Sequence, residues 1–121
     1  MSKREVEQLF SPYFRTYFAS CFSHPSWSNS YIRFVDHILE VTDAKGKLCL
    51  DAGCGFGLLS IFLSGLGAKH VIGLDVNGEK VSIARKLLGM LDPKPMALDI
   101  VKGDALNMPF SDESFDVIVV N

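Results

Sequence analysis

The 121-residue sequence predicts an α/β fold with a mostly parallel sheet. Strand-like apolar runs alternate with helix-like segments over residues 47–120, which is typical of parallel sheets with helical connections. A turn with three alternate glycines joins the first run to the first helix. With 48% hydrophobic residues and a mean hydropathy of +0.22, the chain has enough apolar side chains for one core.

The first predicted strand and its turn span residues 48–57, with the sequence LCLDAGCGFG, and a helix is predicted at 58–66. Asp51 precedes the turn, and Gly53, Gly55 and Gly57 alternate through it. Because glycine has no Cβ, this backbone can bend tightly, adopt positive φ and approach a ligand closely. The turn predicts a site for a nucleotide-type cofactor.

The details of this turn argue against a dinucleotide. A Gly-x-Gly-x-x-Gly pattern counted from Gly53 or Gly55 places Leu58 or Ser60 at the third glycine. No Lys or Arg occurs in residues 48–68 to neutralise phosphates, and no Gly-Lys-Ser/Thr follows as in a P-loop. The turn therefore favours a ligand with positive charge, and an NAD-dependent oxidoreductase is the weaker alternative.

The segment from Asp51 to Gly57 resembles the first motif of class I S-adenosylmethionine-dependent methyltransferases. This resemblance implies a Rossmann-like, three-layer α/β/α fold and S-adenosylmethionine as cofactor. That cofactor carries a sulfonium, an ammonium, a ribose diol and an adenine but no phosphate, so a carboxylate and bare backbone amides suit it. By the resemblance, Asp51 and the glycines at 53, 55 and 57 lie at its methionine and ribose side.

A second strand is predicted at residues 70–75 and ends in Asp75, before a turn and a helix at 79–90. A ribose-binding acid is expected about 20 residues after the glycine turn. A carboxylate at the end of a strand can accept hydrogen bonds from both ribose hydroxyls. The resemblance assigns that role to Asp75.

A third strand is predicted at residues 97–102 and a fourth at 115–120. Gly103, Asp104 and Ala105 follow the third strand. The resemblance implies that Asp104 accepts a hydrogen bond from the adenine amino group and that the Ala105 amide contacts the ring. Asn121 follows the fourth strand, where the methionine end of the cofactor is expected, and it matches the first residue of a motif in amino-group methyltransferases.

The resemblance covers residues 47–121 and corresponds to the donor-binding half of the family's domain, with the sheet truncated after the fourth strand. An unpaired fourth strand would expose its N–H and C=O groups and predicts self-association. Residues 108–118 resemble methyltransferases that act on small molecules such as quinones and sterols. A small-molecule acceptor is therefore expected, while nucleic acid and protein acceptors stay open.

The sequence divides into an N-terminal helical segment, residues 1–45, and a cofactor-binding half-domain, residues 46–121. Nine of the 13 aromatic residues lie between positions 10 and 34, and helices are predicted after Pro12 and at 31–41. This aromatic segment is expected to pack on the sheet domain, with a lid over the cofactor as the alternative.

Net charge, the length of apolar runs, and the cysteines and histidines argue against several classes of function. A net charge of −2 and a pI near 5.8 give no electrostatic footprint for nucleic acid, and no apolar run is long enough to span a membrane. Three cysteines without Cys-x-x-Cys spacing predict a reducing, cytoplasmic location, and three scattered histidines predict no metal site. We expect a cytoplasmic methyltransferase with no assigned catalytic base, or alternatively a noncatalytic, regulatory cofactor-binding module.

Overall fold

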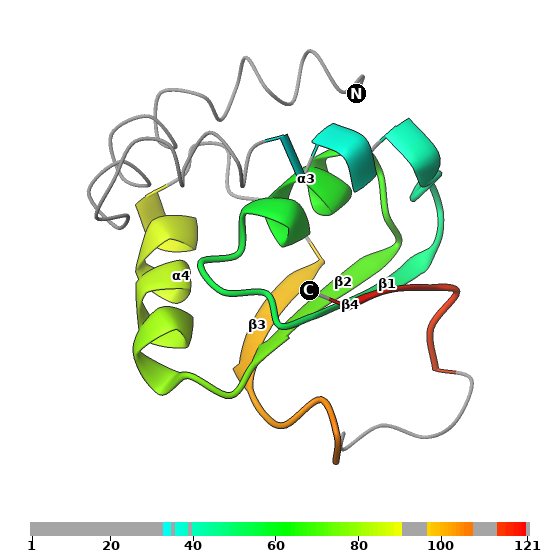
Figure 1. Ribbon diagram of the computed structural model, residues 1–121. Helices are drawn as coiled ribbons and strands as arrows, with labels where there is room; N and C mark the ends of the chain where they lie inside the picture. The colour runs from blue at the N-terminus through cyan, green and yellow to red at the C-terminus, as the bar shows by residue number, and fades with distance from the viewer. Residues whose placement is uncertain (1–32, 35, 39, 91–96, 108–113, 121) are drawn as a thin grey trace.

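The computed structural model describes residues 33–34, 36–38, 40–90, 97–107 and 114–120 (Figure 1). Four strands form one parallel sheet in the order β3-β2-β1-β4. The elements are β1 (Leu48–Ala52), α3 (Leu58–Gly65), β2 (His70–Asp75), α4 (Gly78–Met90), β3 (Leu98–Lys102) and β4 (Val117–Val120). The predicted α/β class and Rossmann-like architecture are confirmed.

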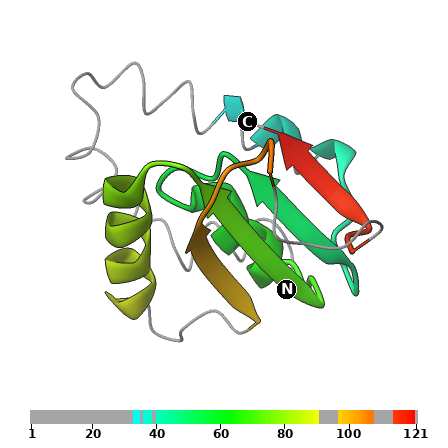
Figure 2. The same cartoon turned by 90° about the horizontal axis from the view of Figure 1, so that it is seen from below.

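β1 lies in the middle of the sheet, and its register aligns the carboxyl ends of the strands. Asp51 is opposite Gly73 of β2 and opposite Val119 of β4. Because all strands are parallel, the turns that follow β1, β2 and β3 leave the sheet at the same edge (Figure 2). This edge is where open α/β sheets bind their ligands.

β4 begins two residues later than predicted. The backbone amide of Asp116 donates to the Leu48 carbonyl at 2.8 Å, and the Asp116 carboxylate accepts from the Leu48 amide at 2.9 Å. A side chain that competes for backbone groups in this way delays regular strand pairing. β3 likewise begins at Leu98 rather than at Ala97, which has a positive φ of 54°.

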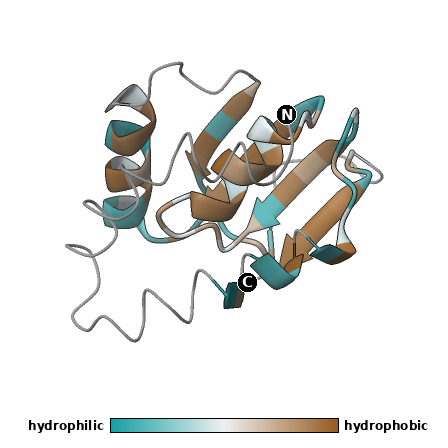
Figure 3. Cartoon of the chain, turned by 90° about the horizontal axis from the view of Figure 1, so that it is seen from above, coloured by the Kyte–Doolittle hydropathy of each residue, from teal (hydrophilic) through white to brown (hydrophobic). Residues whose placement is uncertain are grey.

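The main core lies between the sheet and helices α3 and α4, which cover one face of the sheet (Figure 3). α3 is almost wholly apolar, with every residue from Leu58 to Leu63 buried. Helical residues within 33–41 also reach this core, where Phe34 and Ile38 pack against it. The described part of the N-terminal segment therefore contributes to the sheet's core, and the domain boundary near residue 45 stays a prediction.

The opposite face of the sheet carries a smaller cluster, built around Leu50, Ala52 and Leu74. Within the described ranges, α3 and α4 lie on one face of the sheet, and β4 pairs only with β1 (Figure 2). Ile118 and Val120 of β4 are 55% and 77% exposed. Self-association through this strand stays a prediction. In the same ranges, no helix is long and apolar enough to cross a membrane.

Candidate functional site

The glycine loop follows β1 and turns back over the end of β2. Gly53, Gly55 and Gly57 have φ values of 78°, 55° and 84°, in the left-handed region that residues with a Cβ rarely adopt. The amides of Gly53 and Cys54 donate to the Leu74 carbonyl at 2.7 and 2.9 Å. The positive φ expected for these glycines is confirmed, and the loop is anchored to the neighbouring strand.

Asp75 lies at the end of β2, directly beside this loop. One carboxylate oxygen accepts from the Gly55 amide and the other from the Asn77 amide, both at 2.8 Å. Asn77 in turn accepts from the amides of Glu79 and Lys80, at the start of α4. The Asp75 side chain is partly exposed. Because each carboxylate oxygen has two lone pairs, Asp75 keeps acceptor capacity for a ligand.

Asp51 is fully buried at the end of β1. Its Oδ2 accepts a hydrogen bond from the Ser60 hydroxyl at 2.7 Å, and its Oδ1 has no hydrogen-bond partner among the described residues. Burial, as the largest cause, raises the pKa of Asp51 to about 6, and the charge of Asp75 adds to this, while hydrogen bonding from Ser60 lowers it. The buried Oδ1 can still accept a hydrogen bond from a cationic donor.

Sequence reasoning missed Ser60 and its neighbour Gly73. A Cβ placed on Gly73 would lie 2.8 Å from Ser60 Oγ and 2.6 Å from Ile100 Cδ1, closer than real Cβ contacts allow. The signal was an isolated glycine inside a predicted strand, which often marks a close approach by another group. Gly73 thus makes room for the serine that binds Asp51.

The other predicted residues follow β3 and β4. Asp104 Oδ1 accepts from the Leu106 amide at 2.9 Å, and both Asp104 and Ala105 are exposed. The Gly103 amide donates to the Asp75 carbonyl at 3.0 Å, which ties the turn after β3 to the end of β2. The structure brings the glycine loop, the Asp51 and Asp75 carboxylates and this turn to one edge. Asn121 lies outside the described residues.

Two more residues of the glycine loop have definite surroundings. Cys54 is fully buried, and burial raises the pKa of its thiol to about 12, with the charges of Asp51 and Asp75 adding to the effect. A thiol in that state is a poor nucleophile. Phe56 has the Lys80 ammonium 5.7 Å from its ring centroid. Within the described ranges, no cluster of His, Cys, Asp or Glu could hold a metal ion.

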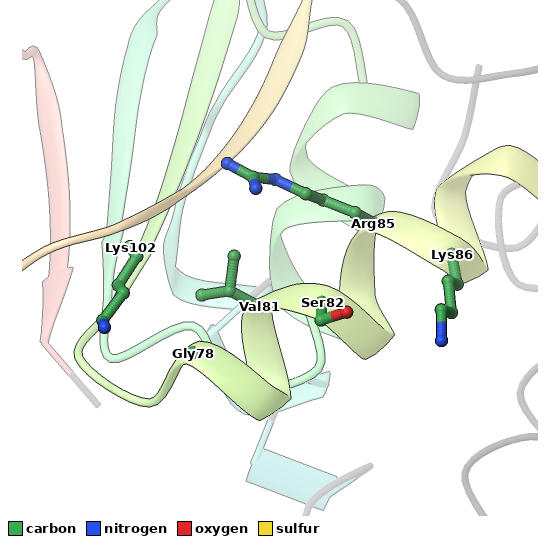
Figure 4. A pocket seen from close by; sticks show the side chains of 6 residues that line it. All are labelled: Gly78, Val81, Ser82, Arg85, Lys86 and Lys102. Carbon is green, nitrogen blue, oxygen red and sulfur yellow. The ribbon is translucent and has the colours of Figure 1, made fainter.

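Two cavities of about 390 and 400 Å³ lie along α4 and β3. Figure 4 shows the first, with the Arg85 side chain pointing toward β3. Its lining contains three basic side chains and no acidic one, which disfavours a cationic ligand. Neither lining includes Asp51, Asp75 or the glycine loop. The residues that line the first cavity are Gly78, Val81, Ser82, Arg85, Lys86 and Lys102.

Comparisons with known proteins agree with this arrangement. Residues 49–121 match the family model described as Methyltransferase domain. The chain is 34% identical to phthiotriol/phenolphthiotriol dimycocerosates methyltransferase 1 of Mycobacterium ulcerans (strain Agy99) over 92 residues. This alignment covers 75% of this chain and 31% of that protein. The chain is also 35% identical over 81 residues to the rRNA N(6)-adenosine-methyltransferase Mettl5 of Drosophila melanogaster. That alignment covers 65% of this chain and 37% of the Drosophila protein.

The crystal structure of the YcgJ protein from Bacillus subtilis superposes with a TM-score of 0.63 at 25% identity, covering 69% of this chain and 35% of that chain. The chain therefore spans about a third of the length of these relatives. The matched region begins at the second residue of β1 and contains the glycine loop and every later helix and strand that the structure describes. This chain belongs to the methyltransferase domain family, with the class I Rossmann-like fold whose members use S-adenosylmethionine.

Proposed function

We propose that this protein binds S-adenosylmethionine through the edge formed by β1, β2 and β3 and transfers its methyl group to a small-molecule acceptor. The observation that carries the proposal is the acidic glycine loop, in which the Asp51 and Asp75 carboxylates flank a turn without basic residues. Such a site suits a cationic cofactor without phosphates.

The described residues fit the separate parts of this cofactor. Asp51 retains a buried, unpartnered Oδ1, which suits the ammonium or sulfonium side of the donor. Asp75 is partly exposed at the end of β2 and would accept hydrogen bonds from the ribose hydroxyls. Asp104 and the Ala105 amide would contact the adenine, and Asn121 the methionine end. The three loop glycines allow close approach of the ligand to the backbone.

S-adenosylmethionine would supply a methyl group activated by its sulfonium, and an acceptor nucleophile would attack that carbon in line, with S-adenosylhomocysteine as the leaving group. The part of this chain in that reaction is orientation, because holding two reactants in line removes much of the entropic barrier. Leu74 and Asp75 support the loop for this purpose by accepting three hydrogen bonds of 2.7 to 2.9 Å from its amides.

The choice of a small-molecule acceptor rests on residues 108–118 and on the M. ulcerans relative, whose name specifies phthiotriol and phenolphthiotriol dimycocerosates. A nucleic acid is the second candidate. It is favoured by the basic cavity lining of Arg85, Lys86 and Lys102 and by the Drosophila relative, named as an rRNA methyltransferase. Transfer of a labelled methyl group into an organic extract or into total RNA separates the two.

Binding of the donor is tested first by amide NMR spectra of the chain alone, with S-adenosylmethionine and with NAD. We expect the signals of Gly53, Gly55 and Asp75 to shift with S-adenosylmethionine and to stay in place with NAD. Shifts with NAD alone would overturn the proposal in favour of an oxidoreductase. Tight donor binding without methyl transfer to any acceptor class would favour a noncatalytic, regulatory module.

We also propose a cytoplasmic location. Cys49 and Cys54 are free, buried thiols, a state that a reducing compartment maintains. The distribution of a fluorescent fusion between cell fractions checks this, and recovery outside the cytoplasm would contradict it.

A further inference from the structure

Ser60 and Asp51 form a buried polar pair between α3 and β1. Both residues have 0% exposed surface, and the Ser60 hydroxyl donates to Asp51 Oδ2 at 2.7 Å. The other residues of α3 from Leu58 to Leu63 are apolar. Burying a hydroxyl in such a helix is unfavourable unless it is hydrogen-bonded, so the pairing with Asp51 accounts for a serine at this position.

The packing around this pair keeps the hydroxyl in place. Gly73 is opposite Asp51 in the β1–β2 register, and a Cβ there would come within 2.8 Å of Ser60 Oγ. The hydroxyl occupies one carboxylate oxygen, Oδ2, and the other oxygen, Oδ1, has no partner among the described residues. Ser60 thereby determines which oxygen of Asp51 is left for a ligand.

We propose that Ser60 is a positioning residue for the donor, because its hydroxyl holds Oδ2 of Asp51 and leaves Oδ1 to accept a hydrogen bond from the cationic end of S-adenosylmethionine. This inference rests on the proposed function. It assigns no contact between Ser60 and the donor, and its effect passes through the Asp51 carboxylate.

The charges around Asp51 explain why a neutral hydroxyl matters. The glycine loop contributes Cys54, whose raised pKa of about 12 keeps the thiol neutral, and β2 contributes Asp75, whose negative charge opposes ionisation of Asp51. The register partners of Asp51, Gly73 and Val119, carry no charge. Hydrogen bonding from Ser60 lowers the pKa of Asp51 against these effects. Without it, Asp51 would be protonated over more of the neutral pH range.

The test compares the full 121-residue wild-type chain with Ser60→Ala and with the control Ser64→Ala, on the same helix one turn later. The Asp51 titration is followed by the ¹³C carboxyl signal without ligand, and S-adenosylmethionine affinity by calorimetry from pH 5.5 to 8.5. We expect the Asp51 midpoint to rise by about one pH unit in Ser60→Ala and to stay unchanged in the control.

The affinity of Ser60→Ala for S-adenosylmethionine should fall by about threefold at pH 6.5 and by nearly tenfold at pH 5.5, and it should recover toward pH 8.5, where Asp51 ionises again. A purely structural role would lower the affinity equally at every pH. In an Asp51→Asn background, which has no carboxylate to titrate, Ser60→Ala should no longer change the pH profile. If Ser60→Ala does not fold, Ser60→Cys keeps the size with a weaker donor and should give a smaller shift in the same direction.

An unchanged Asp51 midpoint, or an equal loss of affinity at all pH values, would overturn the assignment of Ser60. Failure of the wild-type chain to bind S-adenosylmethionine at any pH would overturn the proposed function instead. The ligand-free titration keeps these two failures distinguishable, because the effect of Ser60 on the Asp51 midpoint is measured without the donor.

Discussion

The carboxylate of Asp75 accepts a hydrogen bond from the backbone amide of Gly55 at 2.8 Å, across 20 residues of sequence. The same side chain accepts from the Asn77 amide, so it joins the glycine loop to the turn before α4. The acid to which the family resemblance assigns the ribose therefore also supports the loop that would hold the rest of the donor. Under the proposed function, loop geometry and ribose binding would depend on this one side chain.

Replacement of Asp75 should weaken donor binding and loosen the loop together. Asp75→Ala removes the carboxylate that accepts from the Gly55 and Asn77 amides, together with the expected ribose contact. We therefore expect the free energy of S-adenosylmethionine binding to weaken by about 1–3 kcal/mol and the melting temperature to fall. Asp75→Asn retains one acceptor oxygen and should lie between wild type and Ala. Calorimetric titration and thermal melts measure the two effects. Unchanged affinity in Asp75→Ala would show that this acid does not hold the donor.

Asp104→Ala tests the adenine contact. We expect a loss of about 1–3 kcal/mol in S-adenosylmethionine binding, because a hydrogen bond to a charged acceptor is removed. The control is Asp99→Ala, in which an exposed carboxylate that lies 2.9 Å from His70 Nε2 is lost from β3 itself. This control should bind like wild type in the same titration. Equal losses in both variants would point to a general effect of negative charge rather than to an adenine contact.

The buried Asp51 carboxylate should make stability fall as pH rises. Its folded pKa of about 6 lies above the ordinary value of 3.8, so the folded state holds the proton more tightly than the unfolded state between these values. The unfolding free energy is therefore lowered progressively from about pH 4 to above pH 6. Asp51→Asn removes this effect. The unfolding free energy of the variant, relative to that of wild type, should therefore be about 2 kcal/mol higher at pH 8 than at pH 4.5.

Urea unfolding of the wild-type and Asp51→Asn chains at the two pH values measures this difference. The same substitution should weaken S-adenosylmethionine binding at pH 8, because the negative charge is lost. A stability difference that does not change with pH would contradict a raised pKa for Asp51.

Gly73→Ala should destabilise the fold despite being a small change. The added methyl would approach Ser60 Oγ and Ile100 Cδ1 within 2.8 Å and force one of them to move, at a cost of about 1–3 kcal/mol in unfolding free energy. Gly89→Ala is the control, since a Cβ at that exposed helical position meets nothing within 4 Å. It should be neutral or stabilise α4 by up to about 1 kcal/mol. Chemical denaturation compares both, and a neutral Gly73→Ala would refute the close packing.

Arg85→Ala should weaken the outer strand of the sheet. Arg85 Nε donates to the Ile100 carbonyl of β3 at 2.9 Å, and its side chain extends from α4 toward that strand (Figure 4). We expect a loss of about 1–2 kcal/mol in unfolding free energy, because this hydrogen bond to the strand is removed. Lys86→Ala, the next residue along α4, should change stability by less than about 0.5 kcal/mol. Faster amide exchange in β3 of Arg85→Ala would locate the effect, and protection equal to wild type would refute it.

Much of the fold follows from local patterns in the sequence. The spans of β2 and α4 lie within one residue of their predicted limits, because apolar periodicity and flanking turn residues act over short distances. The predicted start of β4 was wrong by two residues, because Asp116 makes its hydrogen bonds with Leu48, which is 68 residues away in the sequence. Contacts over that separation leave no local pattern.

The sequence by itself determined the glycine turn, the acid before it and the acid at the end of the next strand. These features depend on dihedral freedom and residue spacing, which are properties of adjacent residues. Only the tertiary structure decided that Gly55 binds Asp75 and that Ser60 binds Asp51, with Gly73 leaving room for the hydroxyl. Burial and hydrogen-bond partners depend on how distant segments pack, and that packing determines the charge state of Asp51.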